Sequence, residues 1–358
     1  MHLFYRRWGT EPIAEMIFLR VIIIKIDIVG GSLSGLSTAI SLKRHNKTVD
    51  VTVHEKYKTI GYNHEGRRCG EGYQAKGEWA KWKPVGKSIF NDITKVETIV
   101  GKKHYSFSRK PGVFFMLNRQ EFICQLAREA EKLGVTISTG DMIKSVDNLD
   151  GDYIVDASGC PSTIKREIKL EKGLKGITYQ QTLEDCNLFS PNVLKVFLTD
   201  FSPGYFWVFP RNPEKKEVNL GIGTLIDTDS KLKETLEKFK EEQGVEGKVN
   251  YIVGGLIPAG LQRPLKYKNI LFVGDAGVGT FTLLGEGIYR ALMSGDIAGY
   301  CLGSGHPEQY TKIIYDKFIG WDIVGKLFLE VASISNKISR RALFAMYRLY
   351  LGYYYSYH

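Results

Sequence analysis

One cysteine of this chain stands in a setting that suits a reactive group. Cys69 lies in the sequence RRCGEG at 67–72, where two glycines bracket a glutamate. That spacing is typical of a special backbone turn. A thiol in such a turn either fills space as a small hydrophobe or takes part in chemistry beside a redox centre, where Arg68 would lower its pKa. Composition alone favours the inert role.

A strand, a glycine-rich turn, a helix and a second strand follow one another near the N-terminus. The apolar run 26–29 leads into GGSLSG at 30–35, a helical pattern continues to about residue 44, and the apolar run 49–53 ends at Glu55. The sequence therefore predicts a parallel βαβ unit with an acid at its far end.

The residue types in this turn can hold a dinucleotide. Gly30 lets the chain turn sharply out of the strand, and Gly35 lets the helix pack closely on the sheet, while Ser32 replaces the usual middle glycine. Free N–H groups at the helix start suit a pyrophosphate, and Glu55 can accept hydrogen bonds from a ribose. The alternative is an ordinary βαβ unit with a Gly-rich turn.

A second element of the same kind stands late in the chain. The apolar run 270–273 leads into Gly274-Asp275, and Gly287 precedes a predicted helix that begins at Ile288. Two such turns predict one cofactor domain assembled from distant segments. The alternative for Asp275 is a helix cap or a turn residue.

A predicted helix over 118–133 carries an unusual residue in its first turn. Asn118 can cap the helix, with Glu121 three residues later. Arg119 stands where the helix dipole would favour an acid. Its guanidinium is expected to reach either a phosphate or solvent.

Alternating polar and apolar residues from 177 to 226 predict an antiparallel sheet. In GYFWVFP, the rings of Tyr205, Trp207 and Phe209 fall on one face, where they would either line a pocket or pack beneath a helix. The segment GGLIPAG at 254–260 is expected to be a loop built around Pro258.

Composition narrows the class of protein. The chain has 358 residues and a net charge of +10, but its basic residues are scattered, which argues against nucleic acid. The five cysteines form no C-x-x-C pair, so no metal site is predicted. The apolar run 17–29 is too short and too charged to span a membrane. We expect a cytoplasmic protein. If it binds the membrane, we expect peripheral binding to the cytoplasmic face.

These patterns predict an α/β fold. It comprises a Rossmann-like dinucleotide-binding domain, an inserted antiparallel-sheet domain and a helical C-terminal tail. The expected bounds are 1–15 for an extension, 16–175 and 262–307 for the dinucleotide-binding domain with a loop-rich insert at 56–104, 176–261 for the inserted domain, and 308–358 for the tail.

Together the motifs resemble the geranylgeranyl reductase family, which is similar to the p-hydroxybenzoate hydroxylase group of flavoproteins. The resemblance covers about 25–302 and rests on RCGEG at 68–72, GYFWVFP at 204–210 and the segment 254–258. It implies an FAD enzyme that hydrogenates prenyl chains of membrane lipids, with electrons from an external donor, either a reduced nicotinamide or ferredoxin.

The resemblance also implies residue roles. Cys69 would lie beside flavin and substrate, and Asp275 would hold the ribityl chain. The remaining cofactor contacts would come from Gly30, Ser32, Gly35, Glu55, Arg119, Gly274, Gly287 and Ile288. The substrate pocket would be lined by Tyr205, Trp207, Phe209, Pro210, Gly255 and Pro258.

Two other functions compete with a prenyl reductase: an oxygen-using monooxygenase or halogenase of the same fold, and a non-enzymatic flavin or lipid-binding protein. A segment near the C-terminus bears on the membrane question. If 337–351 is a helix, basic residues fall on one side and apolar residues on the other, which suits an anionic membrane surface. The alternative is a helix docked on the protein's own core.

Overall fold

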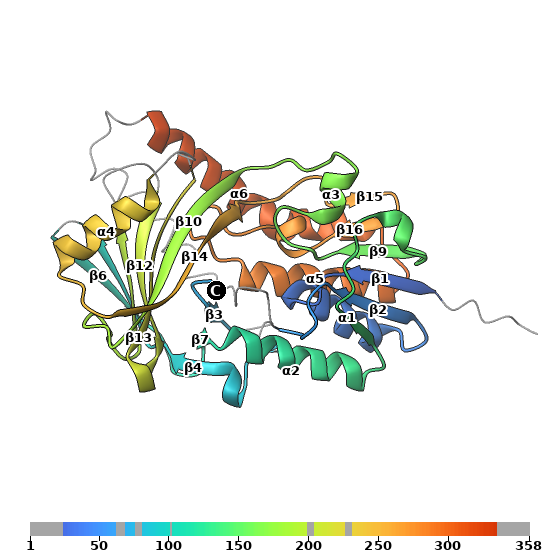
Figure 1. Cartoon of the computed structure of the whole chain (residues 1–358). Helices are drawn as coiled ribbons and strands as arrows, with labels where there is room; N and C mark the ends of the chain where they lie inside the picture. Colours follow the sequence, from blue (N-terminus) through green and yellow to red (C-terminus); the bar gives the residue numbers. More distant parts are fainter. Residues whose placement is uncertain are drawn as a thin grey trace, which may run out of the picture.

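The computed structural model describes residues 24–61, 69–75, 81–100, 102–198, 204–225 and 231–334. The predicted extension at 1–15, the predicted amphipathic helix at 337–351 and Arg68 lie outside these residues. The described chain forms two large sheets and one small sheet, flanked by helices (Figure 1).

The first sheet is the core of the cofactor-type domain. Its six strands run in the order β15 (Lys266–Tyr267), β16 (Ile270–Phe272), β9 (Tyr153–Asp156), β1 (Lys25–Val29), β2 (Asp50–Glu55) and β8 (Thr136–Thr139). All pairs are parallel except β15 with β16. Four of the five residues of β1 are buried, as expected for a central parallel strand.

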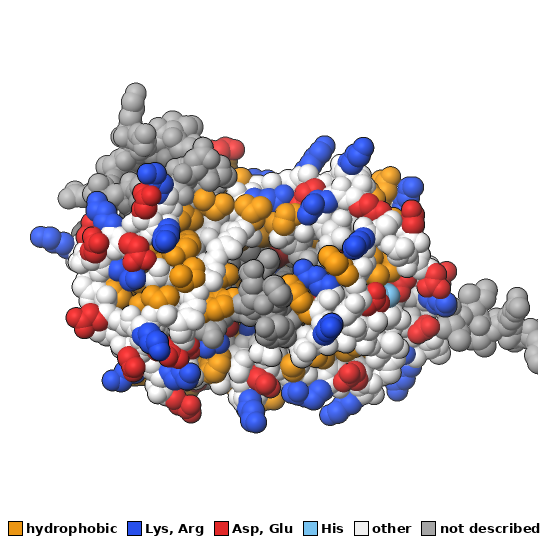
Figure 2. All heavy atoms as spheres, in the orientation of Figure 1, with side chains coloured by type: hydrophobic (Ala, Val, Ile, Leu, Met, Phe, Trp, Pro, Cys, Tyr) orange, Lys and Arg blue, Asp and Glu red, His pale blue; other side chains and the backbone are white. Residues whose placement is uncertain are grey.

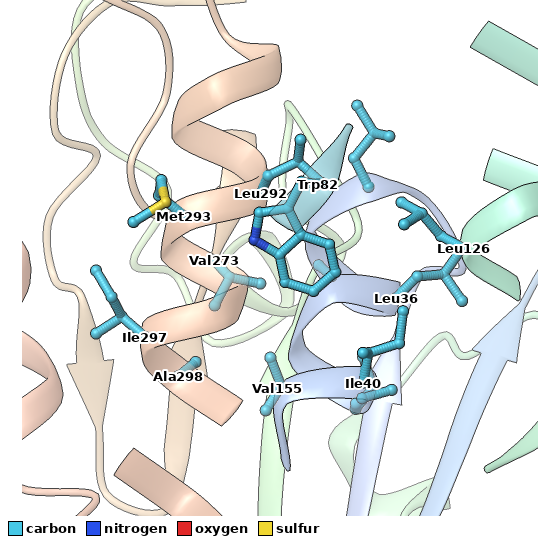
Figure 3. Close-up of a cluster of buried hydrophobic side chains, with 14 of the residues drawn as sticks. Leu36, Ile40, Trp82, Leu126, Val155, Val273, Leu292, Met293, Ile297 and Ala298 are labelled. Carbon is cyan, nitrogen blue, oxygen red and sulfur yellow. The ribbon is translucent and has the colours of Figure 1, made fainter. Parts of the chain in front are cut away.

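Three helices cover one face of this sheet and a short one covers the other. The first group is α1 (Leu33–His45), α2 (Arg119–Lys132) and α5 (Ile288–Gly303), and α3 (Thr163–Glu167) lies on the opposite face. Figure 3 shows this core, in which Leu36 and Ile40 of α1 and Leu292 of α5 belong to one cluster of buried side chains with Val155 of β9 and Val273, which follows β16. The predicted cap of α2 is confirmed, because Asn118 accepts a hydrogen bond from the Glu121 N–H at 3.4 Å.

The second sheet has seven strands and stands beside the first domain (Figure 1). Its order is β14 (Lys248–Pro258), β10 (Lys175–Glu184), β13 (Glu217–Thr224), β12 (Gly204–Asn212), β11 (Val193–Leu198), β5 (Lys95–Val100) and β6 (Lys103–Ser108). Helix α4 (Leu232–Gln243) packs on its outer face through Leu232, Leu236 and Phe239. This confirms the predicted antiparallel sheet between segments of a Rossmann-like domain.

Two local expectations differ from the structure. The segment 56–104, expected to be loop-rich, contains β5, which joins the second sheet by pairing in parallel with β11. The segment 254–260, expected to be a loop, belongs mostly to β14, which pairs with β10 up to Pro258. In both cases the partner strand lies far along the chain, so local composition does not reveal the pairing.

The remaining described elements are a small sheet, a long helix and short 3-10 helices. A three-stranded sheet contains β3 (Gly72–Gln74), β7 (Phe114–Leu117) and β4 (Ile89–Asp92). Helix α6 (Gln309–Ile334) packs on α5. Short 3-10 helices lie at η2 (Gly86–Ser88), η3 (Val146–Asn148), η4 (Pro213–Lys215) and η5 (Gly274–Ala276). Among the described helices, none combines the length and apolar character needed to cross a membrane.

Candidate functional site

The turn between β1 and α1 accepts only glycine at two positions. Gly30 has a φ of +112°, and a Cβ there would lie 2.4 Å from the Ala157 carbonyl oxygen. A Cβ at Gly35 would lie 2.0 Å from the Gly30 carbonyl oxygen. Ser32 is the N-cap of α1, but its side chain makes no capping hydrogen bond. The first N–H groups of the helix are therefore free of a side-chain cap, as an anion site requires.

Glu55 closes one side of this turn. It is 8% exposed, and its two carboxylate oxygens accept hydrogen bonds from the Gly31 N–H and the Tyr57 N–H, both at 2.9 Å. Each oxygen keeps lone pairs for a further donor. The carboxylate is thus held at the end of β2, where a ribose hydroxyl can reach it.

The residue before Glu55 is held by two acids. His54 makes a 2.9 Å hydrogen bond to Asp27 and a 2.8 Å hydrogen bond to Asp141. Burial disfavours the charged imidazole, but the two carboxylates outweigh it and raise the pKa of His54. The imidazole thereby joins β1 and β2 to the segment after β8.

Close helix packing brings the second turn against the first. A Cβ at Gly274 would lie 2.5 Å from the Ser34 Oγ of α1, and the Gly274 N–H donates to the Ser294 Oγ of α5 at 2.8 Å. On α5, a Cβ at Gly295 would lie 2.1 Å from the Ser37 Oγ. Glycine on α5 and small hydroxyl side chains on α1 therefore allow the backbones to approach closely.

Asp275 and the start of α5 lie at the same place. Gly287 is the N-cap of α5, without a side-chain capping bond, and Ile288 is the first helical residue. A Cβ on Gly287 would lie 3.7 Å from the Asp275 Oδ1. Burial raises the pKa of Asp275, while the charges of Arg119 and Arg290 act in the opposite direction. The predicted cofactor residues are thus gathered around the two turns.

Arg119 extends from the first turn of α2 towards this group. Burial disfavours its charge, but Cys69, Asp275 and Glu71 outweigh that effect and raise the pKa of Arg119. Its buried Nε has no hydrogen-bond partner in the described chain. A cation held in this way, with a donor to spare, suits an anionic group placed between the turns.

The Cys69 thiol is part of a closed turn. The Glu71 N–H donates to the Cys69 Sγ at 3.2 Å, and Glu71 has a φ of +62°. Burial raises the pKa of the Cys69 thiol, whereas the Arg119 guanidinium, which is hydrogen-bonded to it, lowers that pKa. Among the described residues, Arg119 is therefore a cation that acts on this thiol, whereas the predicted effect of Arg68 lies outside the described residues.

The aromatic residues of β12 divide between two faces, as the alternation predicts. Phe206 stacks on Phe239 of α4 at 4.1 Å between ring centroids. On the inner face, the ring centroids of Tyr205 and Trp207 are 5.9 Å apart, and those of Trp207 and Phe209 are 6.3 Å apart. The inner rings therefore form a continuous wall, here called the aromatic wall.

Contacts join the aromatic wall to the cofactor-type domain. The Tyr205 hydroxyl donates to the Leu284 carbonyl, just before α5. At the other end, a Cβ on Gly70 would lie 2.9 Å from the Phe209 ring, so the Cys69 turn touches the wall. The wall thus spans from the Cys69 turn to the segment before α5.

Three further predicted pocket residues lie on these strands. The Pro210 carbonyl accepts from the Asn91 side chain at 2.9 Å. The Pro258 carbonyl accepts from the Thr280 N–H at 2.8 Å, which joins the end of β14 to the segment after η5. A Cβ at Gly255 would meet no atom within 4 Å, so this position borders open space.

Several buried polar residues of the second sheet were missed by sequence reasoning. Arg211 pairs with both Glu71 and Glu217, and all three side chains are at most 9% exposed. Gln180 and Asn219 each donate to the Cys69 carbonyl at 3.3 Å. The signal that could have revealed them is the presence of polar residues at inward positions of strands whose other inward residues are apolar.

Comparisons with known proteins agree with this arrangement. The family profile described as the geranylgeranyl reductase catalytic domain matches residues 175–257, which include the aromatic wall. The digeranylgeranylglycerophospholipid reductase of Methanocella arvoryzae is 29% identical over 80% of this chain and 79% of its own length. The enzyme of the same name from Methanothrix thermoacetophila is 25% identical over 75% of this chain and 74% of its own length.

Solved structures share the fold. A geranylgeranyl bacteriochlorophyll reductase-like protein from Thermoplasma acidophilum has a TM-score of 0.71 at 21% identity, covering 90% of this chain and 95% of its own. The flavin-dependent halogenase CmlS has a TM-score of 0.65 at 14% identity, covering 87% of this chain and 66% of its own. The profile match and the reductase relatives together indicate that this chain is an oxidoreductase that is similar to the geranylgeranyl reductases.

Proposed function

We propose that this chain binds FAD and adds two hydrogens across isolated double bonds of prenyl chains, of the geranylgeranyl type, in isoprenoid membrane lipids. The observation that carries the proposal is the contact between the Cys69 turn and Phe209 of the aromatic wall. Together with the hydrogen bond from the Tyr205 hydroxyl to the Leu284 carbonyl, this contact supports a site in which a wall suited to an apolar chain adjoins the turns suited to a dinucleotide. The names of the relatives support the same substrate class.

The residues of the two turns fit FAD. The glycines at 30 and 35 leave room for the backbone to approach a pyrophosphate, because any side chain would collide with main-chain oxygens. Glu55 offers a fixed carboxylate to the ribose of the adenosine half. Asp275 would hold the ribityl chain, and the N-terminus of α5 would favour negative charge on the bound ring system.

The aromatic wall and Cys69 would assist the reaction at the alkene. Bound FAD supplies a hydride when it is reduced, and the electrons come from an external reduced nicotinamide or ferredoxin. An isolated alkene accepts hydride readily only as a proton is added to its other carbon. Cys69 or a bound water would deliver that proton. The ring faces of Tyr205 and Trp207 would stabilise the developing positive charge by about 0.5–2 kcal/mol.

A lipid substrate also implies contact with a membrane surface. Helix α6 exposes Ile323, Val324 and Leu327, which share one side of the helix. Figure 2 shows further hydrophobic side chains over the side of the molecule where β14 lies, and that strand exposes Ile252 and Leu256. These surfaces support peripheral binding to the membrane by this protein, together with the predicted segment 337–351. Co-sedimentation with anionic vesicles tests it, and equal binding after truncation at Ser335 would reject a role for the tail.

The decisive experiment is anaerobic incubation of dithionite-reduced protein with geranylgeranyl lipids, read by mass spectrometry. The expected product gains two hydrogens for each double bond. Trp207→Ala should lower this turnover far more than it lowers flavin reduction by dithionite. Cys69→Ala should keep FAD but change the rate or the product pattern, whereas Cys124→Ala, on α2, should change neither. No gain of hydrogen, with hydroxylation of an aromatic compound in air, would indicate a monooxygenase instead.

A further inference from the structure

We infer that Gln180 is a positioning residue that ties the Cys69 turn to the aromatic wall and so fixes where the thiol lies. Its side-chain amide forms a hydrogen bond with Trp207 of the aromatic wall and another with Cys69 of the turn. The Trp207 Nε1–H donates to the Gln180 Oε1 at 2.9 Å, and the Gln180 Nε2–H donates to the Cys69 carbonyl at 3.3 Å. The inference rests on the proposed place of Cys69 beside the substrate.

Asn219 acts in the same way from the neighbouring strand. Its Nδ2 donates to the Cys69 carbonyl at 3.3 Å and to the Glu71 Oε2 at 3.2 Å. The Thr182 hydroxyl donates to the Asn219 Oδ1 at 2.8 Å, which fixes the orientation of the amide. Gln180 and Asn219 are 3% and 0% exposed, so water does not replace either bond.

The strand register explains why these two amides converge on one turn. Trp207 and Gln180 both lie opposite Gly221 of β13, and Phe209 lies opposite Asn219. Side chains in directly opposed positions point to the same face of a sheet. The aromatic wall and the two amides therefore share the inner face, and the Cys69 turn contacts both.

The other side of the turn is held by the cofactor-type domain. The Leu117 N–H, just before α2, donates to the Glu71 carbonyl at 2.9 Å, and the charge of Arg119 on α2 lowers the pKa of the Cys69 thiol that burial raises. The turn thus bridges the two domains. A thiol held from both sides keeps one position relative to the wall, and preorganisation of this kind governs the rate of the step that it serves.

The test removes the Gln180 amide while keeping its volume. Gln180→Met leaves the Trp207 N–H and the Cys69 carbonyl without this link, so the turn should open to solvent. Opening increases access of a reagent, and it lowers a pKa that burial has raised, so both effects speed alkylation. We expect iodoacetamide to modify Cys69 more than threefold faster at pH 8, measured by peptide mass spectrometry on the purified protein.

A matched control lies at the next residue of β10. Gln181 is also 3% exposed, but it points to the other face, where it bonds Glu237 and Lys240 of α4. Gln181→Met should therefore leave the alkylation of Cys69 within twofold of the wild-type rate. If Gln180→Met does not accumulate as folded protein, Gln180→Glu serves in its place. Its carboxylate still accepts from Trp207 but cannot donate to the Cys69 carbonyl.

The alkylation readout needs no substrate, so it separates this inference from the proposed function. A pH profile of Cys69 alkylation in Gln180→Met that matches the wild-type profile would overturn the positioning role. In the lipid assay, Gln180→Met should lower kcat at least tenfold while KM changes less, and equal kcat would count equally against it. If the wild type reduces no prenyl lipid, the proposed function fails while the alkylation result still stands.

Discussion

Gly221 of β13 provides a sharp test of how the aromatic wall is built. A Cβ at this position would lie 2.2 Å from Cζ2 and 2.4 Å from Cε2 of Trp207, because the indole lies flat over the glycine. Gly221→Ala must therefore displace the indole, which also breaks its 2.9 Å hydrogen bond to Gln180. The substitution adds one methyl group, and this group displaces the side chain of Trp207.

The expected cost follows from these two effects. Overpacking of a buried site costs about 1–3 kcal/mol. Loss of the hydrogen bond adds about 0.5–1.5 kcal/mol. Gly221→Ala should therefore lower the free energy of unfolding by about 1.5–4.5 kcal/mol, measured by urea unfolding followed by circular dichroism. Turnover of prenyl lipid should fall with it, since the displaced ring would obstruct the substrate.

Gly255→Ala is the control for stability. The same substitution on the inner face of β14 places its Cβ more than 4 Å from every neighbour. The free energy of unfolding should then change by less than about 0.5 kcal/mol. If Gly221→Ala is as stable as Gly255→Ala and its tryptophan near-ultraviolet signal is unchanged, the indole does not lie over Gly221, and the wall is wrongly described.

Three further predictions concern the cofactor turns and the buried charges. Gly35→Val should abolish FAD binding in calorimetry, because a Cβ collides with the turn, and retained affinity would remove the turn from the site. Arg211→Met should lower the free energy of unfolding by about 3–5 kcal/mol, since two buried carboxylates lose their cation. Arg44→Met, in a more exposed ion pair, should cost at most about 1 kcal/mol. His54 has a raised pKa, so its charge stabilises the fold fully below its unfolded pKa of about 6.5, and the effect fades as pH rises through the folded pKa. The stability gap between wild type and His54→Asn should therefore shrink with rising pH, and a gap that widens would contradict the assignment.

The sequence predicted the two glycine-rich turns because their evidence is local. The glycines at 30 and 35, the acid at Glu55 and the pair Gly274-Asp275 follow strands whose apolar runs are unmistakable. Gly30 has the positive φ that its position in the pattern implies. The alternation in β12 likewise separated the aromatic wall from the residues that pack under α4.

The sequence did not predict which strands pair when they lie far apart along the chain. The segments now assigned to β5 and β14 were expected to be loops, and each becomes a strand only through its partner, β11 or β10. A short strand gains its stability from backbone hydrogen bonds to that partner rather than from its own composition.

By itself, then, the sequence determined the βαβ unit, the second turn and the face of the aromatic rings, since each depends on residues within a few positions of one another. Only the tertiary structure decided that Gln180 and Asn219 meet at the Cys69 carbonyl, and that the charge of Arg119 acts on the thiol. These contacts depend on how two sheets and a helix start are placed in space. Buried polar groups must find partners wherever the fold brings them, and the order of residues does not record where that is.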